Sequence, residues 1–130
     1  MQLSAKIEQE LSALGEADRA EFLSDLGLSA PARDVLVRAC YERMDLISFF
    51  TDGDDECRAW TIPAGTDAVT AAHEIHSDIA RGFIRAEVVP FDALKEAGSH
   101  KAAKAAGAVR LEGKEYPVKD GDVIYFRFNV

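Results

Sequence analysis

The chain has 130 residues, enough for one well-packed core or for a small domain joined to part of another. Hydrophobic residues make up 48% of the sequence and charged residues 29%, a composition typical of a globular protein. The sequence has no apolar run of membrane-spanning length and no signal-peptide pattern, so we expect a cytoplasmic protein without a membrane partner. A formal net charge of −8 argues against general nucleic-acid binding but is compatible with a local basic patch.

The first 45 residues predict helices. Apolar residues recur at helical spacing over 4–14 and 16–26, and Gly27 follows where a left-handed capping residue is favoured. A third helix is predicted with Ser29 as its N-cap, Pro31 in its first turn and an apolar face that includes Cys40. Three short apolar stripes bury little against one another, so we expect these helices to need a sheet to pack on.

A β-hairpin is predicted over residues 46–62. Two strands rich in β-branched and aromatic residues flank the turn sequence Asp52-Gly53-Asp54-Asp55. Thr66 or Asp67 is expected to cap the next helix, which gives way to a strand across Gly82. Simple alternation in that strand places Ile84, Ala86 and Val88 on one face, which is apolar. Phe83, Arg85 and Glu87 lie on the other face, whose charged residues would meet solvent or a partner.

The remaining residues predict short surface helices over 91–107, broken at Gly98, then a tight hairpin around Gly113 and a last strand from Asp122 to Val130. That strand carries Ile124, Phe126 and Phe128 on one face and should lie inside the sheet, because so apolar an edge would aggregate. The element order predicts the α+β class and a ubiquitin-like β-grasp, with a helix on one sheet face and the other face free.

Few residues suggest catalytic or metal chemistry. Cys40 and Cys57 are interpreted as reduced core residues without an activating neighbour, so neither a nucleophile nor a disulfide is expected. His73 and His76 have helical spacing, but a third strong ligand is not evident and we expect no metal; His76 should bond at the helix end, with Ser77 or Asp78 capping the next turn. The acidic turn at 52–56 lacks calcium-loop spacing.

A contact face is the more interesting prediction. Alternation pairs Arg58 with Trp60, Arg85 with Glu87, and Tyr125 with Arg127. If all three pairs face away from the helix, arginines among aromatic rings form a platform suited to unpaired bases. The alternative is that Trp60 packs beneath the 91–107 helices or against residues 30–45, leaving arginines that pair with Glu87 and Asp122. Both interpretations remain open from the sequence.

Several segments together resemble the C-terminal TGS domain of the YchF family, the Obg-like ATPase branch of the P-loop proteins. The resemblance covers nearly the whole chain and rests on residues 46–51, 58–62, 75–78, 81–88, 110–114, 118–123 and 126–130. It implies a TGS domain of β-grasp fold over 46–130, preceded over 1–45 by the helical tail of a P-loop nucleotide-binding domain. In that setting Ser4, Ala5 and Lys6 resemble the end of the motif that contacts the nucleotide base.

The resemblance also implies a function. We expect a fragment cut just before Ser4 whose full-length parent hydrolyses nucleotide, preferring ATP over GTP, with Mg²⁺. The fragment itself has no G-x-x-x-x-G-K-[ST] motif, so we expect it to need no cofactor and to hydrolyse nothing. Its expected role is regulatory contact with the ribosome or RNA through Arg58, Trp60, Arg85, Tyr125 and Arg127. The alternative is a protein-binding or intramolecular lid on its own P-loop domain that does not bind RNA.

Overall fold

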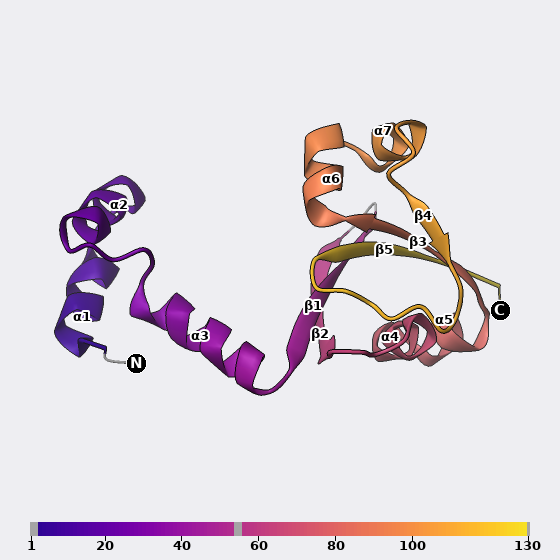
Figure 1. Cartoon of the computed structure of the whole chain (residues 1–130), viewed down its shortest axis with the longest axis horizontal. Helices are drawn as coiled ribbons and strands as arrows, with labels where there is room; N and C mark the ends of the chain where they lie inside the picture. Colours follow the sequence, from indigo (N-terminus) through magenta and orange to yellow (C-terminus); the bar gives the residue numbers. More distant parts are fainter. Residues whose placement is uncertain (1–2, 54–55, 130) are drawn as a thin grey trace. The chain divides into compact units, whose positions relative to one another are not determined.

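The computed structural model describes residues 3–53 and 56–129, and the chain divides into two compact units between residues 44 and 45. Figure 1 labels the helices and strands of both units. Asp54, Asp55 and Val130, which the sequence placed in the hairpin turn and the last strand, lie outside the described residues. Within the described ranges, no helix is long and apolar enough to cross a membrane.

The first unit contains the three predicted helices, α1 (Ala5–Ala13), α2 (Glu16–Asp25) and α3 (Ala32–Arg43). Gly27 has a φ of 66°, as the capping prediction required. The prediction of Ser29 as N-cap was wrong, because Pro31 occupies that position and has no side chain that could cap. The carboxylate of Glu8 in α1 does so instead, accepting from the backbone N–H of Ala32 at 2.8 Å and of Arg33 at 3.4 Å.

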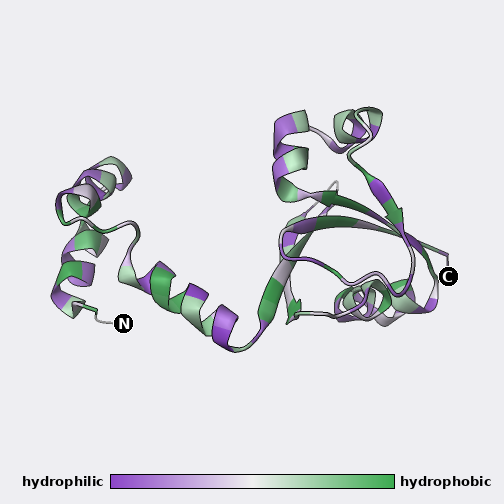
Figure 2. Ribbon diagram, in the orientation of Figure 1, coloured by the Kyte–Doolittle hydropathy of each residue, from purple (hydrophilic) through white to green (hydrophobic). Residues whose placement is uncertain are grey.

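The second unit is built on a five-stranded sheet of order β2-β1-β5-β3-β4. The strands are β1 (Leu46–Asp52), β2 (Cys57–Pro63), β3 (Phe83–Pro90), β4 (Arg110–Glu112) and β5 (Asp122–Phe128). β1 and β2 form the predicted antiparallel hairpin. β5 lies between β1, to which it is parallel, and β3, to which it is antiparallel, so the predicted interior position of the last strand is confirmed. Hydrophobic residues dominate the central strands (Figure 2).

Helices cover both faces of this sheet (Figure 1). α4 (Ala68–Ile75) and α5 (Ser77–Arg81) lie on one face, where α4 begins at the predicted cap Asp67. α6 (Phe91–Ala97) and α7 (His100–Ala105) lie on the other and bury a second cluster around Val89, Ala103 and Val123. The expectation of a free second face was therefore wrong. The alanines of α6 and α7 let these short helices approach the strands closely.

The strand alternation predicted for β3 breaks at its start. The register shifts between Phe83 and Arg85, and this bulge moves the residues before it to the opposite face. Phe83 therefore joins Ala86 and Val88 in the core, whereas Ile84 is 53% exposed. The placement of Ile84 with the core residues was wrong.

The hairpin predicted around Gly113 was also wrong. β4 pairs with β3, and the chain after it turns at Gly113 and runs back to the start of α4. There the N–H of Ala68 donates to the carbonyl of Tyr116 at 2.9 Å, and the N–H of Val118 donates to that of Thr66 at 3.0 Å. The short 116–118 segment thus closes the helix start instead of forming a strand beside β4.

Candidate functional site

The predicted contact residues lie on two faces of the sheet. Trp60 packs on the α4 face, stacked on Phe49 with ring centroids 6.4 Å apart and planes at 17°, and its Nε1 donates to Thr51 Oγ1 at 3.0 Å. The guanidinium of Arg58 lies 4.2 Å above the Trp60 ring on that face. The single platform is therefore not formed, and Trp60 does not pack beneath the 91–107 helices, which was one of the alternatives. The sequence could not show how the alternation of one strand relates to that of another.

Arg85, Tyr125 and Arg127 lie together on the α7 face. In the β3–β5 ladder Arg85 is opposite Arg127, and Glu87 is opposite Tyr125, so these four side chains emerge on the same side. The Glu87 carboxylate is buried, with 3% of the residue exposed, and the guanidinium of Arg127 pairs with it. This pairing confirms one part of the alternative interpretation.

Two side chains of α7 complete the surroundings of Glu87. Lys104 Nζ donates to both carboxylate oxygens, at 3.1 and 3.3 Å, and His100 Nε2 lies 3.4 Å from Oε2. Burial raises the pKa of the Glu87 carboxyl, but the hydrogen bond from Lys104 and the charges of Arg127 and Lys104 outweigh it and hold the pKa below its ordinary value. The carboxylate is therefore an ionised anchor for the cations around it.

These contacts create a local basic surface. Lys104 and Arg127 pair with Glu87 yet keep 55% and 50% of their side chains exposed. We call the exposed set on this side of the sheet the basic face, made up of Arg85, Lys101, Lys104, Tyr125 and Arg127. The sequence missed Lys101 and Lys104, because nothing in the helical pattern of 91–107 indicated which sheet face the helix covers.

A pocket of about 340 Å³ adjoins the basic face. The end of β1 at Asp52, the β5 residues Val123 and Tyr125, and the α7 residues His100 and Lys101 line it. The His100 and Tyr125 rings lie 5.8 Å apart with an interplanar angle of 33°. An apolar floor, aromatic walls, a carboxylate and an ammonium group thus meet in one recess.

The residues that resemble a nucleotide-base motif start the first helix. Ser4 is the N-cap of α1, and its Oγ accepts from the N–H of Ile7 at 3.5 Å. Ala5 and Lys6 follow in the first turn, where backbone N–H groups have no partner within the helix. A pocket of about 270 Å³ lies between this turn and the residues before α3, lined by Ser4, Leu28 and other side chains. Such N–H groups suit a base edge.

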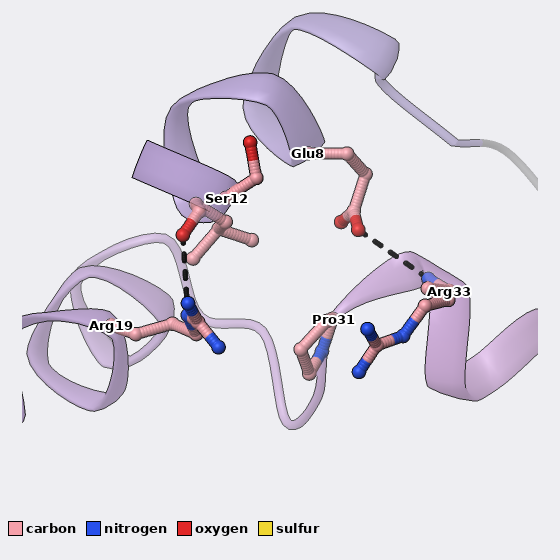
Figure 3. A pocket seen from close by; sticks show the side chains of 6 residues that line it. Glu8, Ser12, Arg19, Pro31 and Arg33 are labelled. Atoms are coloured by element: carbon pink, nitrogen blue, oxygen red, sulfur yellow. Dashed lines mark hydrogen bonds between the residues drawn. The ribbon is translucent and has the colours of Figure 1, made fainter. Parts of the chain in front are cut away.

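A larger pocket, of about 370 Å³, lies among the same helices and is shown in Figure 3. Its charged side chains hold helix ends. Arg19 donates to the carbonyl of Leu11 at 3.2 Å and to that of Leu14 at 3.0 Å, and Glu8 accepts from the first turn of α3. Because these groups already serve the helix termini, the pocket has the character of a structural gap.

The catalytic and metal candidates have local roles. Cys40 and Cys57 are exposed free thiols, so their interpretation as core residues was wrong. The Cys57 thiol donates to Asp52 Oδ1 at 3.0 Å, which raises its pKa and opposes activation. His76 bonds at the end of α4 as predicted, but it also caps α5, because its Nδ1 accepts from the N–H of Asp78 at 3.1 Å. The prediction that Ser77 or Asp78 caps this turn was wrong. No cluster of three metal-ligating side chains occurs in the described part of the chain.

Comparison with known proteins identifies the family. The YchF-GTPase_C model, described as "Protein of unknown function (DUF933)", matches residues 46–129. Over 126 residues, 97% of the chain, the sequence is 50% identical to Ribosome-binding ATPase YchF of Bacillus subtilis (strain 168) and 43% identical to Obg-like ATPase 1 of Rattus norvegicus. The solved structure of the Schizosaccharomyces pombe YchF GTPase superposes on 96% of the chain with a TM-score of 0.83 and 31% identity.

The chain spans about a third of each of these proteins, namely 34%, 32% and 33% of their lengths. The structural match covers the C-terminal region of a YchF protein and confirms the predicted α+β, β-grasp class. The chain therefore belongs to the YchF family and corresponds to its C-terminal region.

Proposed function

We propose that this chain is the ribosome-contacting regulatory part of a cytoplasmic nucleotide hydrolase and does not hydrolyse nucleotide by itself. The observation that carries the proposal is the basic face, a set of exposed cations on a chain whose formal net charge is −8. Its relatives are named ribosome-binding ATPases, which supports a ribosomal partner. Ribosomal RNA offers the phosphates that such a surface attracts.

The ionised Glu87 carboxylate contributes by holding the cations in place. Lys104 and Arg127 approach it from a helix and from the neighbouring strand, so their exposed ends are fixed relative to Arg85. Cations held in place in this way lose less side-chain entropy on binding phosphate than free surface side chains do. The basic face is thus suited to a fixed arrangement of phosphates.

The proposal assigns catalysis to the parent protein. Residues 1–45 would be the tail of its P-loop domain and residues 46–130 the TGS domain. The parent would bind ATP or GTP with Mg²⁺, with Ser4, Ala5 and Lys6 at the base. Phosphate-release assays on the isolated chain should stay at the level of the blank, and release that survives further purification would contradict this part of the proposal.

Ribosome co-sedimentation tests the contact. The chain should pellet with purified bacterial ribosomes at low salt, and Arg85→Glu should reduce the pelleted fraction severalfold. Arg58→Glu is the matched control, because Arg58 is also an exposed strand arginine but lies on the α4 face. Loss of pelleting in Arg58→Glu alone would show that the ribosome contacts the α4 face and not the basic face. Failure of the wild type to pellet with ribosomes would refute the proposal.

A second candidate function is an intramolecular lid on the P-loop domain. It is favoured by the exposed apolar side chains of Ile84 and Phe128, which are 53% and 45% accessible. A lid would bind a separately prepared N-terminal part of the parent and would ignore RNA. Measuring both interactions with the same preparation separates the two functions.

A further inference from the structure

We infer that the pocket between β1, β5 and α7 receives a single unpaired RNA base, with guanine preferred. This inference rests on the proposed ribosome contact and names what that contact recognises. The pocket, of about 340 Å³, is lined by Asp52, His100, Lys101, Val123 and Tyr125. Pockets that hold small ligands start at roughly 300 Å³.

The walls suit an aromatic ring. Tyr125 is 51% exposed, and its ring lies 5.8 Å from that of His100, so one side of the recess is aromatic. Val123, which is buried, closes the floor. Bases that leave a helix or a loop stack on such rings, whatever their identity.

The charged groups supply orientation. Lys101 is exposed at the rim of the pocket, and Arg127 emerges on the same sheet face as Tyr125, so both can meet the backbone phosphates of the nucleotide. Asp52 offers a carboxylate at the end of β1, with one oxygen accepting from Cys57. An ionised carboxylate has about four acceptor positions, so it retains capacity for a base edge. Guanine presents two adjacent N–H donors on its Watson–Crick edge, which match a carboxylate.

The arrangement also excludes duplex RNA. A paired base keeps its Watson–Crick edge inside the helix, and the Asp52 carboxylate would then have nothing to accept from. Repulsion between the carboxylate and the phosphates would add to this. We therefore expect recognition of a bulged or single-stranded guanosine.

Fluorescence anisotropy with the full chain tests the inference. The probes are labelled octauridylates that carry no substitution or one central guanine, adenine or cytosine, together with a duplex form of the guanine probe. The guanine single strand should bind most tightly. Tyr125→Ala should weaken it roughly tenfold or more, whereas Tyr125→Phe should stay within about twofold of wild type. Asp52→Asn should abolish the guanine preference among the single strands.

The inference is refuted if Tyr125→Ala and Tyr125→Phe bind the guanine single strand with the same affinity. It is also refuted if the wild type binds all four single strands alike, or binds the duplex as tightly as the guanine single strand. Trp60 fluorescence monitors folding of each variant. If Tyr125→Ala unfolds, two variants at exposed positions test the inference in its place: Asp52→Asn should lose the guanine preference, and Lys101→Glu should bind all single strands more weakly. Arg85-dependent pelleting of ribosomes without any oligonucleotide binding would refute the base pocket and leave the ribosome contact standing. Tyr125-dependent oligonucleotide binding without pelleting of the chain with ribosomes would refute the ribosome contact and support the base pocket.

Discussion

Lys104 reaches from α7 to the buried Glu87 carboxylate of β3, with its Nζ 3.1 Å from one oxygen and 3.3 Å from the other. This pair joins a surface helix to an interior strand of the sheet and places a cation beside Arg127. The structure of the second unit and its proposed contact surface therefore depend on the same carboxylate.

Glu87→Gln should lower the free energy of unfolding and make that free energy depend less on pH in the acidic range. The folded-state pKa lies below the ordinary value, so the ion pairs stabilise the fold fully above the unfolded-state pKa of about 4.3, and this stabilisation is lost as the pH falls through the folded-state pKa. At neutral pH we expect a loss of about 1–2 kcal/mol, limited because Lys104 and Arg127 can return to water. Urea unfolding at several pH values measures both effects. An equal fall of wild type and variant below pH 4.5 would contradict the account.

Gly82→Ala should destabilise the second unit for steric reasons. A Cβ at Gly82 would lie 2.3 Å from the carbonyl oxygen and 2.8 Å from the carbonyl carbon of Asn129, and backbone must move to admit it. We expect a loss of about 1–3 kcal/mol in the free energy of unfolding. Gly113→Ala is the control, since a Cβ there meets nothing within 4 Å, and it should change stability by less than about 0.5 kcal/mol. Equal stability of the two variants in urea would count against the close approach.

Asp52→Asn should make Cys57 more reactive. The hydrogen bond to the Asp52 carboxylate, together with its charge, raises the thiol pKa, and removing the charge should increase the thiolate fraction. Alkylation with iodoacetamide at pH 8, followed by mass spectrometry of the labelled peptides, measures the rate. Cys40 serves as an internal reference whose rate should not change. An unchanged Cys57 rate would show that Asp52 does not control this thiol.

Glu8→Ala should weaken the start of α3. Its carboxylate accepts from two backbone N–H groups of that helix, a role worth about 0.5–2 kcal/mol when a helix cap is removed. Glu10→Ala, at an exposed position of the same helix, is the control. Far-UV circular dichroism should show a loss of helix at lower urea in the first variant and not in the second. The same transition in both would argue that Glu8 does not cap α3.

The sequence predicted the features that depend on neighbours along the chain. A helix cap at Thr66 or Asp67 and a helix break at Gly98 follow from local chemistry and were confirmed, with Asp67 as the cap and Gly98 between α6 and α7. Contacts between distant segments were less accessible. The bulge that exposes Ile84 is set by pairing with β5, and the cap on α3 comes from Glu8, 24 residues before Ala32. Hydrophobic periodicity carries no information about either.

The candidate site shows the same division. Alternation correctly grouped Tyr125 with Arg127 and Arg58 with Trp60, because these pairs share a strand. Alternation could not show that the two pairs lie on opposite faces of the sheet. That arrangement depends on which side of each strand packs against α4. Lys104 was missed because α7 had to be docked on the sheet before its contact with Glu87 could be seen.

The salt dependence of ribosome binding tests the basic face most directly. The dissociation constant of the chain for purified ribosomes would be measured at several potassium chloride concentrations for wild type, Arg85→Glu and Arg58→Glu. If the basic face contacts phosphates, the slope of log affinity against log salt should become shallower by about one in Arg85→Glu and stay unchanged in Arg58→Glu. Identical slopes for wild type and Arg85→Glu would contradict the account.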